Sequence, residues 1–293
     1  MSSHRKSQRQ ERPIRYQTLD LVDHQIRVVT CRMRDAEEQT PLLIFNGIGA
    51  SAELLEPLLL AVGRPVLTFD MPGVGGSSLQ LVPRRMSQLA SLAIKVLDAL
   101  DIGSVHAMGI SWGGGLAQQF AYQYDDRCTG LILAATGTGH LMVPPKLTVL
   151  LQMATPLRYY SAGFFRKIAG DIYGGDFRHD KKLVKQHSKF MAPPSVTAYL
   201  YQLYAAYGWT SLFWLHRLKQ KTLVMAGSDD PIIRPVNARI LAARIPSSTL
   251  ETFDCGHLFL LTRLEESVES ITKFLLSIDA NPVQASSPIN RVY

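Results

Sequence analysis

Six short apolar runs, each bounded by turn residues, alternate with segments of helical spacing along most of the chain. Because apolar residues in these runs are mostly consecutive rather than alternating with polar ones, the runs are typical of strands buried on both faces of a parallel sheet. They are PLLIFNG (41–47), PVLTFDMPG (65–73), SVHAMGIS (104–111), GLILAATG (130–137), KTLVMAG (221–227) and TLETFDCG (249–256). Segments such as AELLEPLLLAV and MSQLASLAIKVLDAL, which separate several of the runs, carry apolar residues at helical spacing. This alternation predicts an α/β fold with a mostly parallel, doubly wound sheet.

The alternation is interrupted once. Residues 138–215 contain no clear strand, and fourteen of the 25 aromatic residues fall within residues 159–214. We therefore predict that 138–215 is a helical cap inserted into a core made of residues 16–137 and 216–278. Two runs flanking Asp23-His24, YQTLDLV and QIRVVTCRM, predict an antiparallel hairpin at the start of the core. A basic flexible tail (1–15) and a loose C-terminal tail (279–293) complete the predicted organisation.

Composition and charge narrow the class of protein. The chain begins with polar and basic residues, and no apolar run is long enough to span a bilayer, so neither a secretory signal nor a membrane span is predicted. Three scattered cysteines without CxxC spacing favour the reducing cytoplasm over a disulfide framework or a zinc site. The net charge of +7 is concentrated in residues 1–15 and 158–189. We interpret these segments as solvated surface, with contact to an anionic surface or polyanion as the alternative, and no nucleic-acid-binding motif accompanies them.

Gly109-Ile110-Ser111-Trp112-Gly113 matches the G-x-S-x-G pattern, with an apolar run before it and a helical segment after it. In that context the serine occupies a sharp strand-to-helix turn, and glycines flank it because side chains there would collide with the neighbouring strand and helix. The hydroxyl then projects at the carboxyl end of the sheet, where α/β proteins bind ligands. The pattern predicts Ser111 as a nucleophile rather than a turn residue.

A serine hydroxyl needs a base, and eight histidines are present. His257 lies on the loop that follows the last predicted strand, where a base should stand in the chain order serine, acid, histidine. The acid should follow the preceding strand, where the chain reads Ser228-Asp229-Asp230. The usual spacing, in which the acid lies three residues beyond the glycine that ends the strand (Gly227), favours Asp230 as the acid and leaves Asp229 as the alternative acid. If Asp230 is the acid, Asp229 caps or braces the turn. Asp254 is a weaker candidate because it precedes His257 too closely.

The negative charge that develops on an ester oxygen needs two backbone donors. The N–H of Trp112 is one candidate, since it begins a helix whose dipole favours negative charge. The N–H of Ile48, in the loop Asn46-Gly47-Ile48-Gly49, is the other, with Asn46 bracing that loop. The glycine-rich stretch 70–78 lacks both the P-loop lysine and G-x-G-x-x-G, so no nucleotide cofactor is predicted.

These residues resemble an α/β hydrolase, and the resemblance extends to intracellular poly(3-hydroxyalkanoate) depolymerases of the medium-chain-length type. It runs from about residue 16 to 275 and includes two segments of the predicted cap, DIYGGDFR and GWTSLFWLH. The other matching segments are PLLIFNGIGA, FDMPGVGGSS, GISWGG, LAQQFAY, ILAAT, AGSDDPII and GHLFLLTR. The resemblance implies a catalytic triad at Ser111, Asp230 and His257, and a granule-stored polyester of 3-hydroxyacyl units as the substrate.

The predicted function is therefore hydrolysis of polyester ester bonds through an acyl-enzyme, in the cytoplasm at storage granules, without a metal or organic cofactor. Aromatic residues of the cap, such as Trp209 and Trp214, are the predicted substrate-binding residues. A small-molecule carboxylesterase or an acyltransferase acting on apolar acyl esters is the alternative, because it would use the same triad. A non-catalytic granule-associated or ligand-sensing protein is disfavoured, because it should lack a member of the triad.

Overall fold

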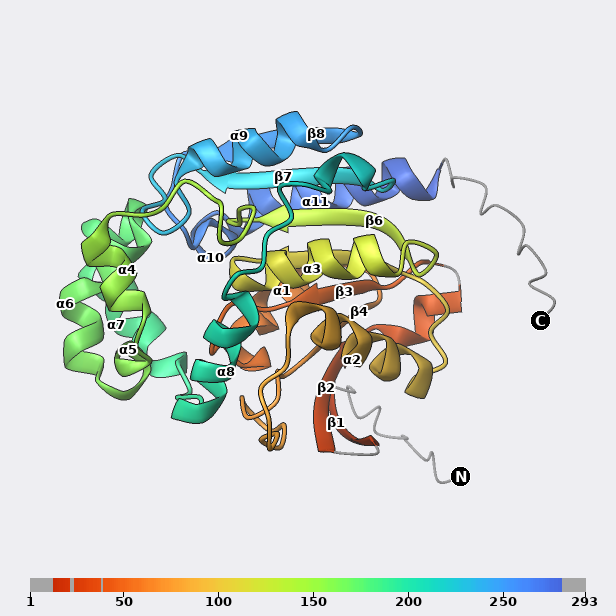
Figure 1. The fold of residues 1–293 in the computed structure, drawn as a ribbon, viewed down its shortest axis with the longest axis horizontal. Coiled ribbons are helices and arrows are strands. Elements are labelled where there is room, and N and C mark those ends of the chain that lie inside the picture. The colour runs from red at the N-terminus through yellow and green to blue at the C-terminus, as the bar shows by residue number, and fades with distance from the viewer. Residues whose placement is uncertain (1–12, 22–23, 38, 281–293) are drawn as a thin grey trace, which may run out of the picture.

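A computed structural model describes residues 13–21, 24–37 and 39–280, and these form an eight-stranded sheet with helices on both faces and beyond one end (Figure 1). The order across the sheet is β1-β2-β4-β3-β5-β6-β7-β8. β1 pairs antiparallel with β2, and β2 with β4, whereas every other pair is parallel. The strands are β1 (Ile14–Leu21), β2 (His24–Cys31), β3 (Leu42–Phe45), β4 (Val66–Phe69), β5 (Val105–Ile110), β6 (Cys128–Ala134), β7 (Lys221–Gly227) and β8 (Ser248–Phe253). The predicted α/β class is confirmed.

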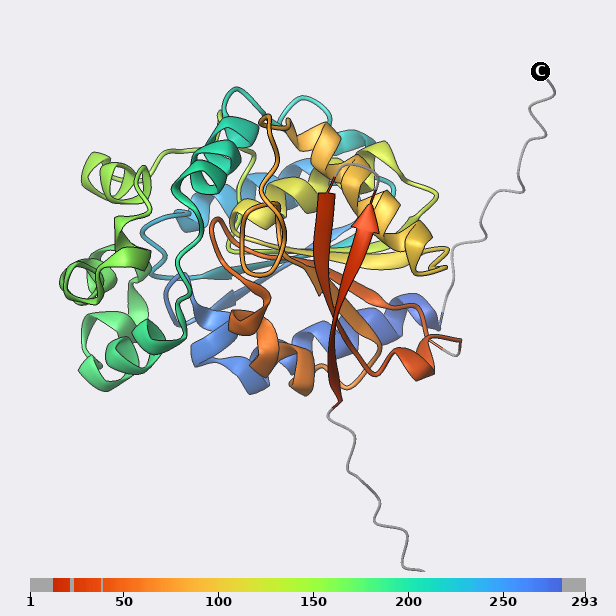
Figure 2. The same cartoon turned by 90° about the horizontal axis from the view of Figure 1, so that it is seen from below.

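The helices of the sheet domain form two outer layers, seen edge-on in Figure 2. One face carries α2 (Met86–Ala99), α3 (Trp112–Gln123) and α9 (Pro235–Arg244). The other carries α1 (Glu56–Ala61), α10 (Phe259–Thr262) and α11 (Leu264–Asp279). Two apolar clusters fill the spaces between these layers and the sheet. Every residue of β3 and β4 is buried, which is why these strands read as continuous apolar runs.

Between β6 and β7 the chain leaves the sheet and forms a group of helices beyond the carboxyl ends of the strands (Figure 1). They are α4 (Leu147–Met153), α5 (Leu157–Tyr160), α6 (Ala162–Tyr173), α7 (Lys181–Phe190) and α8 (Val196–Ala206). All five fall within the range predicted for the inserted cap. We refer to α4–α8 as the cap. Four short 3-10 turns complete the described elements: η1 (Met33–Glu37), η2 (Ala52–Leu55), η3 (Gly175–Arg178) and η4 (Leu215–Arg217).

The predicted chain ends need correction. β1 begins at Ile14, so the last residues of the predicted tail 1–15 belong to the sheet, while residues 1–12 lie outside the described residues. At the other end, α11 continues through Asp279, where the loose tail 279–293 was predicted to begin. The Asp279 carboxylate accepts hydrogen bonds from His106 Nε2 at 2.9 Å and Arg64 Nη2 at 3.1 Å, which fixes this last turn. Residues 281–293 lie outside the described residues.

Of the described helices, none is both long enough and apolar enough to cross a membrane.

Candidate active site

Ser111 occupies the single residue between β5 and α3, in a backbone conformation that side chains rarely adopt. Its φ is +55° and its ψ is −117°. Holding a non-glycine residue there costs on the order of 1–3 kcal/mol, so the surroundings must impose it. They do so through three hydrogen bonds to the serine backbone: its N–H donates to the Ala134 carbonyl at 2.9 Å, and its carbonyl accepts from Gly114 N at 2.9 Å and Thr136 Oγ1 at 2.8 Å.

Glycines on both sides of Ser111 allow this turn to fit against β3 and α3. A Cβ on Gly109 would lie 2.3 Å from the Gly113 carbonyl oxygen, and a Cβ on Gly113 would lie 2.2 Å from the Phe45 carbonyl oxygen. Both obstacles are backbone atoms, which cannot move aside as a flexible side chain could. The need for glycine at these two positions is therefore steric.

We expect Gly113→Ala to lower the free energy of unfolding by about 3 kcal/mol, because the added methyl group overlaps the backbone of β3. Gly103→Ala is the matched control, since a Cβ at Gly103 meets nothing within 4 Å. That control should change stability by no more than about 1 kcal/mol. Urea unfolding of both variants checks this, and equal effects at the two glycines would contradict the steric explanation.

His257 and Asp230 come from the loops after β8 and β7 and meet in a buried pair. The two atoms His257 Nδ1 and Asp230 Oδ2 are 2.7 Å apart, and the residues are only 6% and 4% exposed. The other carboxylate oxygen, Oδ1, accepts the N–H groups of Ile232 and Ile233 at 2.9 Å each. These bonds fix the carboxylate, which in turn fixes the ring. Nε2 of His257 is therefore the nitrogen left for proton transfer.

The cap supports the imidazole ring from a third side. The Tyr173 ring lies nearly parallel to the His257 ring, with centroids 6.2 Å apart and planes 14° apart. The backbone N–H of His257 also donates a hydrogen bond to the Tyr173 carbonyl at 2.7 Å. Ser111 and His257 line the same cavity, and among the described residues no hydrogen bond joins the serine hydroxyl to the imidazole. Such bonds are often long in free enzymes and tighten when substrate binds.

The two alternative acids are engaged elsewhere. Asp229 accepts two hydrogen bonds from the Arg178 guanidinium, at 2.8 and 3.0 Å, and one from the Gly175 N–H at 2.8 Å. The bonds from Arg178 lower the pKa of Asp229. Asp254 accepts a hydrogen bond from Ser228 Oγ at 3.1 Å. The structure thus brings Asp230 to His257, while Asp229 ties the loop after β7 to the cap.

The loop after β3 carries Ile48 beside the serine. Asn46 braces this loop, since its Oδ1 accepts from Gly47 N at 2.8 Å and its Nδ2 donates to the Ser51 carbonyl at 2.9 Å. Ile48 and Ser111 line one cavity. Among the described residues the Ile48 and Trp112 amides donate to no protein acceptor. They are therefore available to a ligand oxygen.

Two cap residues that the sequence analysis missed hold both candidate donors in place. The Tyr159 hydroxyl, on α5, donates to the Ile48 carbonyl at 2.7 Å. On α8, Gln202 Oε1 accepts from Gly49 N at 2.9 Å, and the Gln202 carbonyl accepts from Trp112 Nε1 at 2.9 Å. The cap thus orients the peptide groups around Ile48 and anchors the side chain of Trp112.

Ser111 and His257 open into a cavity of about 690 Å³ between the sheet and the cap. Its lining is mostly apolar and comes from α1, α10 and the cap helices. Leu58, Leu261, Met153, Tyr173, Leu183 and Phe190 are representative. A cavity of this size and lining suits an apolar ligand larger than a short acyl group.

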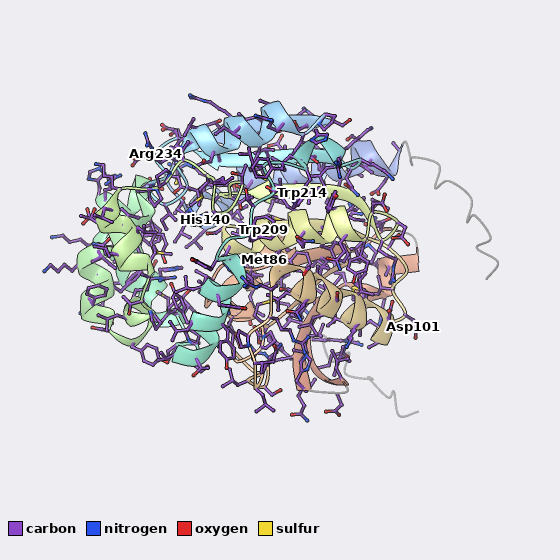
Figure 3. The ribbon with its side chains drawn as sticks, in the orientation of Figure 1. Met86, Asp101, His140, Trp209, Trp214 and Arg234 are labelled. Carbon is purple, nitrogen blue, oxygen red and sulfur yellow. The ribbon has the colours of Figure 1, made fainter. Side chains whose placement is uncertain are left out.

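Trp209 and Trp214, the predicted substrate-binding residues, do not line this cavity. Trp209 Nε1 donates to Gln119 Oε1 at 2.8 Å, and the Trp214 ring stacks on the Tyr122 ring with centroids 4.4 Å apart. Figure 3 shows both tryptophans over the sheet domain rather than among helices α4–α7. The cause is the path of the chain after α8, which returns across α3 before entering β7. Tyr159, Tyr173 and Phe190 are the cap aromatics at the cavity.

His187 of α7 also lines the cavity, packed among aromatic rings. Its ring lies 5.8 Å from Phe165, 6.1 Å from Tyr173 and 5.5 Å from Phe177, measured between centroids. Burial lowers the pKa of His187 to about 4. The neutral ring therefore belongs to the apolar wall at neutral pH.

This lowered pKa of His187 predicts acid sensitivity. In the unfolded chain His187 is protonated near pH 6.5, whereas in the folded chain it is protonated only near pH 4. The free energy of unfolding therefore falls as the pH drops from about 6.5 to about 4. Between pH 7 and pH 5 the expected loss is about 2 kcal/mol. Urea unfolding of wild type and His187→Gln at both pH values checks this. The variant should lose less stability on acidification, and equal losses would contradict the assignment.

Comparison with known proteins identifies the family and the fold. The family model of the alpha/beta hydrolase fold matches residues 40–264. Poly(3-hydroxyalkanoate) depolymerase of Ectopseudomonas oleovorans is 48% identical over 265 residues, which cover 90% of this chain and 93% of that protein. A solved hydrolase from Pseudomonas aeruginosa PA01 has a TM-score of 0.76 at 22% identity, covering 89% of this chain and 98% of its own.

The solved enol-lactonase from Burkholderia xenovorans LB400 has a TM-score of 0.77 at 18% identity, covering 89% of this chain and 100% of its own. At such identities the two structures show a common fold. Together with the family match and the 48% identity, they confirm the predicted fold class and the predicted resemblance.

Proposed function

Because this chain belongs to the α/β-hydrolase family and is 48% identical to a poly(3-hydroxyalkanoate) depolymerase, we propose that it is a serine hydrolase that cleaves the ester bonds of intracellular poly(3-hydroxyalkanoate). Its preferred polymer is of the medium-chain-length type. One observation carries the proposal: Ser111, on its strained turn, and His257, paired with the buried Asp230, open into a single large apolar cavity.

The reaction proceeds in two halves. His257 Nε2 accepts the proton of the Ser111 hydroxyl as Oγ attacks the ester carbonyl carbon, and the Ile48 and Trp112 amides stabilise the oxyanion. The ester C–O bond then breaks, and His257 gives its proton to the leaving alcohol. Water, deprotonated by His257, then attacks the acyl-enzyme, the bond between the acyl carbon and Ser111 Oγ breaks, and His257 returns the proton to Ser111 Oγ as the carboxylic acid leaves. Throughout, Asp230 holds the imidazole in one tautomer and stabilises its protonated form.

The cavity supports a substrate with medium alkyl side chains. Each methylene group transferred from water into such a lining contributes about 0.8 kcal/mol to binding. The leucine, methionine and aromatic side chains around the serine can accept several such groups. A polyester with only a methyl side chain would leave much of this lining uncovered.

We place the enzyme in the cytoplasm, at the surface of storage granules. The cysteines support a reducing compartment, since Cys31, Cys128 and Cys255 all lie in the described part of the chain as free, buried thiols. The apolar cavity beneath the cap supports an encounter with an apolar polymer surface.

A comparison of substrates tests the proposed function. Purified protein is assayed on dispersed polyesters of graded side-chain length and on soluble p-nitrophenyl esters, and released 3-hydroxy acids are quantified. We expect release from polymers with medium side chains to exceed release from poly(3-hydroxybutyrate). Activity confined to the soluble esters would instead identify a small-molecule carboxylesterase. Transfer of the acyl group to an added alcohol or thiol in preference to water would identify an acyltransferase.

A further inference from the structure

Arg158 is a buried cation in the wall of the active-site cavity. It lies on α5 of the cap and is 2% exposed. Its Nη1 donates to the Tyr199 hydroxyl at 2.7 Å, and its Cζ lies 4.6 Å from the centre of the Tyr159 ring and 5.4 Å from that of Tyr199. Two aromatic rings and one hydroxyl thus surround the guanidinium.

Among the described residues no carboxylate pairs with Arg158. The two acidic residues that line the same cavity are engaged elsewhere, because Glu53 binds Arg27 at 2.7 Å and Glu56 accepts a hydrogen bond from Tyr16. The Nε of Arg158 is buried without any hydrogen-bond partner. The guanidinium is therefore both unneutralised and incompletely hydrogen-bonded.

A buried guanidinium without a counterion destabilises the folded protein unless a ligand supplies the missing negative charge and hydrogen bonds. An arginine remains charged at any physiological pH, and a buried charge without a counterion is strongly unfavourable. Contacts with aromatic faces offset only part of that cost. The group that best matches the fork of a guanidinium is a carboxylate, through short, charge-assisted hydrogen bonds. Arg158 and Ser111 line the same cavity.

We propose that Arg158 binds the free carboxylate at the carboxyl end of a 3-hydroxyacyl chain. This inference rests on the proposed function and refines its substrate: the enzyme prefers the esters nearest a free carboxyl end to internal esters. Such a polyester carries one carboxylate per chain, at that end. The carboxylate always belongs to the leaving side of a cleaved ester, since the acyl side ends in a hydroxyl group.

The proposal fits the hydrolytic steps without additional reactants. When Ser111 Oγ bonds to the ester carbonyl carbon and the C–O bond breaks, the leaving alkoxide receives its proton from His257. The leaving fragment is then a 3-hydroxy acid or short oligomer, with its carboxylate held by Arg158. Tyr159 connects the proposed carboxylate site to the loop that carries Ile48, because its ring contacts Arg158 and its hydroxyl donates a hydrogen bond to the Ile48 carbonyl.

A pair of substrates tests the carboxylate site in the unaltered enzyme. Oligomers of 3-hydroxyoctanoate are prepared with a free carboxyl end or with that end methylated. We expect the free acid to be hydrolysed with a kcat/KM about 10–100-fold higher, the range that one charge-assisted contact provides. Equal values for the two oligomers, or a preference for the methyl ester, would overturn the inference while leaving the proposed function intact.

Variants test whether the preference for the free-acid oligomer depends on Arg158. Arg158→Gln should abolish the preference for the free acid, so that the ratio of the two kcat/KM values approaches one. Arg166→Gln is the matched control, because Arg166 is an exposed arginine of the same cap, and it should keep the wild-type ratio. A ratio that survives in Arg158→Gln would contradict the assignment.

Inhibition provides a readout that requires neither a folded variant nor activity on polymer. With p-nitrophenyl butyrate as the substrate of wild-type enzyme, 3-hydroxyoctanoate should inhibit competitively at a concentration about 10-fold or more below that of its methyl ester. Equal inhibition by the acid and the ester would overturn the carboxylate site. If polymer and oligomers are not hydrolysed at all, the proposed function fails, and this inhibition assay still decides the role of Arg158.

Discussion

Ser111→Ala is expected to lower kcat on polyester and on soluble esters by on the order of 10⁶, because the acyl-enzyme cannot form without the serine oxygen. The remaining turnover should reflect binding and oxyanion stabilisation alone. The hydrogen bonds that hold residue 111 all involve its backbone, so the variant should retain the fold. Release of 3-hydroxy acids from polymer, measured beside circular dichroism and thermal unfolding, checks both expectations.

Ser228→Ala is a suitable control, since Ser228 is an exposed serine on the neighbouring loop after β7. It should hydrolyse ester at the wild-type rate. Turnover by Ser111→Ala that matches this control would remove Ser111 as the nucleophile.

The second large effect is expected at Asp230. Asp230→Asn should lower kcat by on the order of 10⁴, because an amide cannot hold His257 in the required tautomer or stabilise its protonated form. The carboxylate is 2.7 Å from Nδ1 and buried, so water cannot replace it.

The neighbouring residue provides the matched comparison. Asp229→Asn weakens the contacts with Arg178 and Gly175 but leaves the His257 pair intact, so activity should stay within a few-fold of wild type. Steady-state kinetics of the two variants checks the assignment. A loss at Asp229 as large as that at Asp230 would contradict it.

Much of the fold was predictable because local patterns determine it. The continuous apolar runs of β3, β4, β5, β6 and β7 reflect burial on both faces of a parallel sheet. Glycines at 109 and 113 reveal a close approach of backbone to backbone, which no other residue permits. For the same reason Ser111 could be singled out from sequence as a candidate nucleophile.

The lining of the cavity around Ser111 and His257 was less predictable, because it depends on how the cap packs onto the sheet. Trp209 and Trp214 are rich in apolar surface and close in sequence to cap residues, but the chain after α8 turns them onto α3. Tyr159 and Gln202 reach the loop after β3 from positions more than a hundred residues away in sequence. Nothing in their local sequence indicates these partners.

Arg158 carries a weak sequence signal of burial. It follows a largely apolar stretch, LTVLLQMATPL, and was grouped with the other basic residues of 158–189 as solvated surface. Charge counting treats every cation in a segment alike, whereas Arg158 is buried and Arg166 is exposed. A lone cation at the end of an apolar stretch is the pattern that could have distinguished it.

The central claim is that Ser111 carries the acyl group of a poly(3-hydroxyalkanoate) during turnover. The most direct measurement is acid quenching of the enzyme during hydrolysis of 3-hydroxyoctanoate oligomers, followed by peptide mass spectrometry. We predict a 3-hydroxyacyl group on the peptide that contains Ser111, and its absence in Ser111→Ala. An acyl group on a different residue, or rapid hydrolysis that proceeds unchanged in Ser111→Ala, would contradict the claim.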